Sequence, residues 1–182
     1  MVLWAVDMKA EGLSLEEAAK HLSELKIEDA VSPEERAFLD DPKPDPASCQ
    51  KLVWRLECIW VLLWSVGHVS DLNWPEGMCN TKFMVPLLED NELKPSFISD
   101  SKLRPVAEIL DQQDLTLRLH WAIRDAYING RQLPANLDWA SSNDWVPANA
   151  SAAVGVVAER HYALNWLTNF MDAEWDDVDT PT

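Results

Sequence analysis

Glycine is scarce in this sequence, with only five residues among 182. Phosphate-binding loops such as the Walker loop and the GxGxxG turn need clustered glycines, so nucleotide chemistry of these kinds is not expected. The GxSxG and HExxH motifs are also missing, which removes the usual signatures of serine hydrolases and zinc peptidases. The three cysteines are odd in number and lack CxxC spacing, which argues against a disulfide framework or a Cys-rich zinc site. We therefore predict a reduced, cytoplasmic protein without a metal or other cofactor.

Long hydrophobic runs are missing as well. The longest apolar run covers residues 52–66 and contains two charges, Arg55 and Glu57. It is shorter than the roughly 20 residues that a transmembrane helix needs. The N-terminal residues lack the basic and apolar parts of a signal peptide. The sequence therefore predicts a soluble protein that does not bind membranes.

Positive charge is in short supply, because 15 lysines and arginines accompany 31 aspartates and glutamates, which gives a net charge of -16. Direct nucleic-acid binding is not expected, since it depends on basic patches that contact phosphates. The charge permits a basic protein partner, or imitation of a nucleic acid towards a protein that binds one. The alternative is that the acidic surface only keeps the protein soluble. The composition leaves the oligomeric state open.

The chain is rich in helix-forming Leu, Ala and Glu, and it contains ten tryptophans. So many tryptophans require a core or an interface in which several are buried. We predict one all-α domain over residues 1–182, an orthogonal helical bundle around a central Trp-rich helix. Its parts are N-terminal helices (1–40), a proline-rich spacer (41–47), the core (48–171) and an acidic tail (172–182).

Local signals indicate where the helices begin and end. Ser14 and Ser32 each open a capping box, so a helix is expected after each. Gly67 and Gly130 are typical residues for ending a helix. The other predicted helices cover about residues 48–66, 84–88, 105–129 and 152–171, and residues 131–150 form a long loop.

Two charges lie in residues 54–64, although this segment is apolar on every side. Such a helix belongs at the centre of a soluble protein, where a charge needs a partner. The last helix carries Glu159 and Arg160 on its apolar stripe, with His161 and Asn165 on the opposite, polar side. We predict that Glu57 pairs with Arg160, and Arg55 with Glu159, in a dry core.

These four charges have two interpretations. They sum to zero, which favours a buried ion network that fixes the register of the helices. The alternative is an acid–base cluster in a cleft, with the candidate catalytic residues Glu57, His120, Glu159 and His161. A metal site is disfavoured because Glu159 and His161 are two residues apart, so their side chains diverge by about 200° around a helix.

A second polar cluster is predicted on the helix of residues 105–129, where Asp111, Asp114 and Arg118 share a face, with Asn165 of the last helix nearby. Asp114 and Arg118 have the spacing of an i,i+4 ion pair, although Asp114 could instead cap a break in the helix. The predicted apolar stripe of this helix is Leu115, Leu119, Ala122, Ile123 and Ala126. The residues predicted to point away from that stripe are His120, Trp121 and Arg124.

Two segments are candidates for partner binding, because exposed tryptophans are typical interface hot spots and acidic side chains steer a basic partner. The loop of residues 131–150 contributes Trp139, Asp144 and Trp145. The acidic tail contributes Trp175, Asp176 and Asp177, and Trp175 is also its only obvious anchor to the core.

Several motifs follow one another in a recognisable order. They are Trp54-Arg55-x-Glu57, Leu62-Leu63-Trp64, Glu108-Ile109-Leu110-Asp111-x-x-Asp114-Leu115, Arg118-x-His120-Trp121-Ala122, Glu159-Arg160-His161-x-Ala163-Leu164-Asn165-Trp166-Leu167 and Trp175-Asp176-Asp177-Val178. Over about residues 33–179 the chain resembles a bacterial family catalogued as domain of unknown function 4272. Leu117, where the family typically has an aromatic residue, and the ending Thr180-Pro181-Thr182 depart from its pattern. The resemblance implies a mostly helical domain and implies no particular activity.

Taken from the sequence, the first functional hypothesis is a non-enzymatic module that binds a basic protein, with an immunity- or antitoxin-like role as its sharpest form. The alternative hypothesis is a hydrolase that uses the Glu/His cluster. A structure separates the two hypotheses. The hydrolase needs its four candidate residues to converge around an open, solvent-filled cleft, whereas dry Arg–Glu pairs with no cavity favour the binding module.

Overall fold

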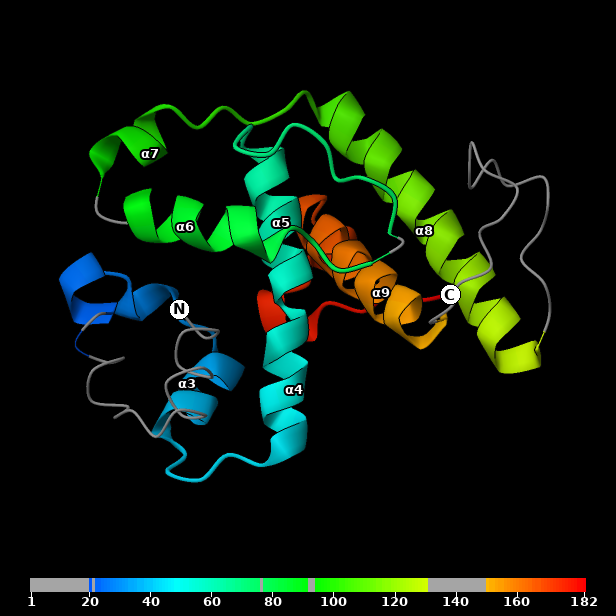
Figure 1. Ribbon diagram of the computed structural model, residues 1–182, viewed down its shortest axis with the longest axis horizontal. Helices are drawn as coiled ribbons and strands as arrows, with labels where there is room; N and C mark the ends of the chain where they lie inside the picture. The colour runs from blue at the N-terminus through cyan, green and yellow to red at the C-terminus, as the bar shows by residue number, and fades with distance from the viewer. Residues whose placement is uncertain (1–19, 21, 76, 92–93, 131–149) are drawn as a thin grey trace.

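The computed structural model of the protein describes residues 20, 22–75, 77–91, 94–130 and 150–182 (Figure 1). Across these residues all regular structure is helical and no strand occurs, so the predicted all-α fold is confirmed. The start of the helix predicted after Ser14 lies outside the described residues, as does the predicted loop up to residue 149. The elements are η1 (Glu28–Ala30), α3 (Pro33–Asp40), α4 (Pro46–Trp54), α5 (Leu56–Ser65), α6 (Thr81–Asn91), α7 (Pro95–Ser99), α8 (Val106–Asn129), α9 (Ala150–Leu167), η2 (Phe170–Asp172) and η3 (Trp175–Asp177).

The predicted central helix is interrupted once, so it forms α4 and α5. α4 begins earlier than expected, at Pro46. The Asp45 carboxylate caps this helix start by accepting hydrogen bonds from the backbone amides of Ala47 at 2.8 Å and Ser48 at 2.9 Å. The helix is interrupted at Arg55, whose amide bonds to the carbonyl of Leu52, three residues back. α5 then ends close to the predicted place, since Gly67 adopts a φ of 88°. Arg55 therefore lies at a junction between two helices and not inside one.

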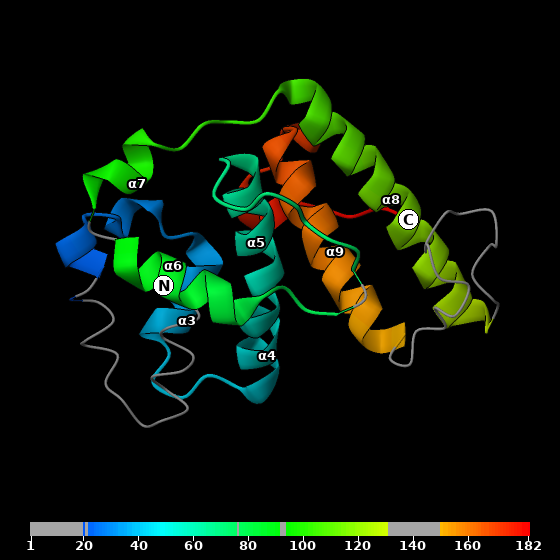
Figure 2. The same ribbon diagram turned by 45° about the horizontal axis from the view of Figure 1, so that its top comes forward.

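α9 is buried over more than half of its circumference. It packs against α8 on one flank and against α4 and α5 on the other, and both views show it between them (Figures 1 and 2). Six side chains on more than half of its circumference are at most 1% exposed, namely Val156, Val157, His161, Ala163, Leu164 and Asn165, whereas Trp166 on the remaining side is 40% exposed. The prediction that His161 and Asn165 occupy an outward, polar side is therefore wrong. These two side chains face α8 and the C-terminal segment.

α8 is one unbroken helix that ends, as predicted, before Gly130, which has a φ of 60°. Asp114 caps no break, and its carboxylate instead pairs with Arg118 at 2.8 Å. The buried side of α8 is rotated relative to the predicted stripe, because Leu115 is 37% exposed whereas His120 is 3% exposed. The prediction that His120 points away from the core is therefore wrong, and its neighbours Trp121 and Arg124 are exposed as expected.

Residues 174–182, here called the C-terminal strap, cross the fold and do not form a loose acidic tail. The Asp176 carboxylate accepts the amide of Glu34 at the start of α3, at 2.8 Å. Val178 is buried, and the carbonyl of Asp179 accepts a hydrogen bond from Asn165 of α9 at 2.8 Å. The hydroxyl of Thr182 accepts a hydrogen bond from Arg124 of α8 at 3.2 Å. The strap thus links α3, α9 and α8, and it covers the side of α9 that the sequence leaves polar.

Gly155 of α9 lies where α9 meets the end of α4, and it offers a test of this packing. A Cβ atom at Gly155 would lie 2.8 Å from Cη2 of Trp54. Alanine stabilises a helix relative to glycine by about 1 kcal/mol, but overpacking costs about 1–3 kcal/mol. We expect Gly155→Ala to lower the free energy of unfolding by about 1–2 kcal/mol in urea denaturation. The control Gly77→Ala, where a Cβ would meet no atom within 4 Å, should change it by less than about 0.5 kcal/mol. A Gly155→Ala protein as stable as the parent would contradict the contact.

Candidate functional site

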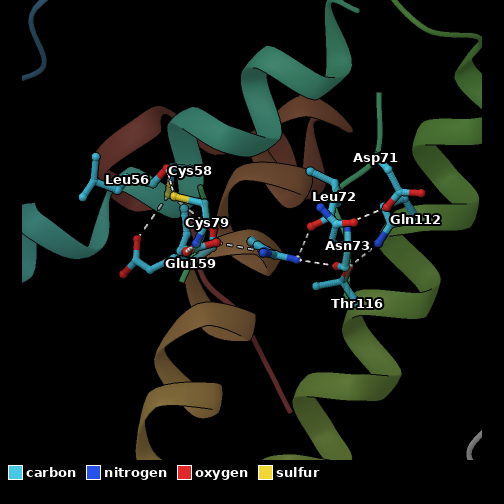
Figure 3. Close-up of polar contacts among 11 residues, drawn as sticks. Leu56, Cys58, Asp71, Leu72, Asn73, Cys79, Gln112, Thr116 and Glu159 are labelled. Carbon is cyan, nitrogen blue, oxygen red and sulfur yellow. Dashed lines mark hydrogen bonds and ion pairs between the residues drawn. The ribbon is translucent and has the colours of Figure 1, made fainter. Parts of the chain in front are cut away.

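Glu57 of α5 and Arg160 of α9 form the more buried of two ion pairs that link α9 to the region around the start of α5. Nε of Arg160 donates to Oε2 of Glu57 at 2.9 Å, and the two side chains are 5% and 0% exposed. The other carboxylate oxygen accepts the amide of Cys79. Nη1 of Arg160 donates to the carbonyls of Leu72 at 2.9 Å and Asn73 at 2.8 Å. In Figure 3, Cys79 lies near α5 and α9, and Leu72 and Asn73 lie on the side towards α8. The pair therefore ties two helices to the loop that leads from α5 to α6.

Arg55 and Glu159 form the second pair, nearer the surface. Nη1 of Arg55 lies 3.0 Å from Oε2 of Glu159, and the side chains are 11% and 18% exposed. The thiol of Cys58 donates to the same carboxylate oxygen at 3.2 Å. The guanidinium carbon of Arg55 lies 3.8 Å from the ring centroid of Tyr162 and 5.5 Å from that of Trp175, a cation–π arrangement. The structure thus brings the four charged residues together in the two pairs expected from the sequence, although this pair is only partly shielded from water.

His120 of α8 and His161 of α9 form a buried imidazole pair, the third polar contact of the core. Their Nδ1 atoms are 3.0 Å apart, so one donates and the other accepts. Burial lowers the pKa of each to about 4. For His120 the nearby His161 and Arg124 lower the pKa further. For His161 the pKa is raised again in part by Asp179 and by a side-chain hydrogen bond with Asn165. Both imidazoles are therefore neutral at pH 7.

Neither buried thiol is activated as a nucleophile. Burial, reinforced by Glu159, raises the pKa of Cys58 well above its ordinary value. Burial, reinforced by Glu57, raises the pKa of Cys79 to about 12. Because the thiolate is the reactive form, the raised pKa values keep both thiols protonated near pH 7.

The four candidate catalytic residues fall into three separate sets of contacts. Glu57 and Glu159 bind different arginines, while His120 and His161 bind each other. In the part of the chain that the structure describes, no three His, Cys, Asp or Glu side chains are grouped to hold a metal ion. Each of the four candidates therefore makes a contact between helices, and the four do not converge on one point.

The predicted second polar cluster is divided between the surface and the core. Asp111 is exposed, and Asp114 and Arg118 form an exposed ion pair. Asn165 is instead buried, and it accepts a hydrogen bond from Gln113 of α8 at 3.0 Å. Asn165 therefore joins α8 to α9, as the imidazole pair does.

The candidate partner-binding residues also separate. Trp139, Asp144 and Trp145 lie outside the described residues. Trp175 is half-buried and packs edge-to-face on Tyr162 and Trp166, with ring centroids 5.2 and 5.3 Å away. Asp176 holds the start of α3, and Asp177 is exposed. Within the strap, Trp175 and Asp176 thus serve as anchors to the fold.

Arg104 is an important residue that the sequence analysis did not select. Its side chain donates to the carbonyls of Trp64 at 2.7 Å, Val69 at 3.0 Å and Ser70 at 2.9 Å. Carbonyls at the end of a helix need such donors, and α5 ends at Ser65. In the sequence, Arg104 stands directly before Pro105, which precedes α8. This position marks a helix start, but it does not indicate which backbone carbonyls the arginine side chain contacts.

The architecture and the motif order can now be compared with known proteins. Residues 1–178 match the family described as Domain of unknown function (DUF4272). The chain belongs to this family. DUF4272 membership confirms the resemblance seen in the motifs, and the description of DUF4272 names no activity. Neither the curated proteins nor the solved structures give a match to the chain. Among the described helices of this DUF4272 protein, none combines the length and apolar character needed to cross a membrane.

Proposed function

We propose that the protein is a non-enzymatic module that binds a basic protein partner. The observation that supports this most is that the ionisable groups of the core neutralise one another. The two Arg–Glu pairs sum to zero, and the imidazole pair is neutral at pH 7. The net charge of -16 is therefore carried by the remainder of the chain. An acidic exterior accelerates association with a basic partner and disfavours acidic ones.

The same contacts weigh against the hydrolase alternative. A general acid or base must exchange a proton with its substrate and so needs a free, reachable atom. Both carboxylate oxygens of Glu57 are engaged inside the core, and His120 and His161 direct their Nδ1 atoms at each other. We therefore favour binding, and in its sharpest form an immunity- or antitoxin-like protein that neutralises a basic toxin in the cytoplasm.

Affinity purification from the native cells tests this proposal. The tagged protein should retain one basic protein at close to equal stoichiometry at low salt, and raised salt should release it, because exposed charges are screened. A heat-unfolded sample of the same chain is the control, since it keeps the charge but loses the fold. Capture of no stoichiometric partner, or equal capture by the unfolded chain, would contradict the proposal. Growth arrest by the captured protein alone, relieved by coexpression, would support the immunity-like form.

A further inference from the structure

The outward side of α8 carries an apolar ridge. Val106, Leu110, Trp121 and Ile128 are 66%, 47%, 54% and 64% exposed, and Leu117 between them is half-buried. At 100° per residue these five residues fall within an arc of about 60° and extend over about 33 Å of helix. We call them the α8 ridge. Exposed apolar residues aligned on one side of a helix indicate an interaction site more strongly than isolated ones do.

The position of α8 leaves the ridge accessible. α9 packs on the inner side of α8, and both views place α8 at the edge of the described helices (Figures 1 and 2). The inner side buries Ile109, Leu119 and Ile123, which are at most 5% exposed. α8 is therefore apolar on two opposite sides, and core packing explains only one of them.

One margin of the ridge is acidic. Asp111, Asp114 and Asp125 follow this margin along the helix, together with Arg118. Arg118 is paired with Asp114 at 2.8 Å, and Asp125 accepts a hydrogen bond from Asn129 at 2.7 Å. Asp111 is exposed, and the formal charges of the three aspartates outweigh that of the one arginine. At the other margin Arg124 donates to the hydroxyl of Thr182 in the C-terminal strap. The ridge thus combines an apolar line with negative charge on one side only.

We infer that the α8 ridge is the surface on which the basic partner docks, and that this partner presents an apolar groove with lysine or arginine along one wall. The inference rests on the proposed function and adds the place and the mode of binding, a helix laid into a groove. Trp121 lies on the ridge next to the acidic margin. It is the expected hot spot, because a large aromatic side chain contributes most binding energy when a groove removes it from water.

A second copy of the chain fits the ridge poorly. Two antiparallel α8 helices related by a two-fold axis would place the acidic margin of one beside the acidic margin of the other. Each copy would also bring a net charge of -16. Like charges across an interface disfavour binding, so the charge favours a basic partner.

Site-specific photo-crosslinking in the native cells tests the inference on the full chain. p-Benzoylphenylalanine replaces Trp121 in one variant and Ile98 in a control, since Ile98 of α7 is 79% exposed and lies away from α8. The expected result is an adduct with a basic protein at position 121, in at least about 10-fold greater yield than at position 98.

With that protein purified, Trp121→Ala should weaken binding by at least about 30-fold and Ile98→Ala by less than about 2-fold. Asp111→Asn with Asp114→Asn should slow association at low salt.

The outcomes separate the inference from the proposed function. A basic adduct at position 98 and none at position 121 would overturn the α8 ridge as the docking surface and leave the binding function standing. An adduct between two copies of the chain, or with an acidic protein, at position 121 would also overturn it. Absence of adducts at both positions, together with an empty affinity purification, would overturn both proposals.

Discussion

Replacement of Arg160 by methionine is expected to lower the free energy of unfolding by about 3–5 kcal/mol, because it leaves a buried carboxylate without its partner. Glu57 has 0% exposure, and Arg160 Nε lies 2.9 Å from its carboxylate. Methionine keeps much of the apolar stem of arginine, so the loss reports mainly the missing charge and its hydrogen bonds. Urea denaturation followed by tryptophan fluorescence measures the change.

The chain provides a matched control for this substitution at its surface. Lys51 and Glu34 are 2.6 Å apart, but their side chains are 53% and 49% exposed, so Lys51→Met should cost at most about 1 kcal/mol. Adding Glu57→Gln to Arg160→Met should recover part of the lost stability, because no charge is then buried alone. A loss below about 1 kcal/mol for Arg160→Met, or no recovery in the double variant, would contradict the role assigned to the pair.

Acid is expected to destabilise the protein through the imidazole pair as the pH falls from 6.5 to about 4. In the folded state both imidazoles have a pKa of about 4, whereas the unfolded chain binds protons near 6.5. The unfolded state therefore binds more protons in this range, so the contribution is complete above pH 6.5 and is lost as the pH falls to the folded pKa. A single imidazole contributes on the order of 3 kcal/mol, and the two contributions are coupled and do not simply add.

Comparison with His120→Gln/His161→Gln isolates this effect, since the carboxylates titrate in both proteins. The free energy of unfolding of the parent should fall more steeply between pH 7 and pH 5 than that of the variant. Proton NMR of the imidazole resonances gives the two titrations directly. Resonances that titrate near pH 6.5 in the folded protein would refute the prediction, and so would parallel stability profiles.

The ion pairs could be predicted from the sequence because few choices satisfy the physics. A charge inside an apolar segment must find an opposite charge. Arg55 and Glu57 in the segment 54–64 therefore required an acid and a base, which α9 provides at Glu159 and Arg160. Helix ends that carry capping residues could also be predicted from the sequence, as at Ser32, where the predicted capping box forms. These features depend on short stretches of sequence and on charge balance.

The imidazole pair could not be predicted, because its burial depends on a distant segment. The hydrophobic periodicity of α9 assigns His161 and Asn165 to a solvent-exposed face, because it assumes that a helix packs on one side only. The C-terminal strap and α8 instead cover that side, through contacts of Asp179 and Gln113 with Asn165. The interruption at Arg55 was missed for a different reason, since no proline or glycine marks it.

Both ion pairs join residues more than a hundred positions apart, with separations of 104 for Arg55–Glu159 and 103 for Glu57–Arg160. On the ribosome α5 therefore emerges long before the charges that neutralise it. Until α9 follows, burying α5 would leave Glu57 in an apolar interior without its partner, which costs free energy, so we expect this tryptophan-rich helix to stay hydrated until Arg160 has been made. A prematurely terminated chain that stops before residue 159 would stay in that state and be readily degraded.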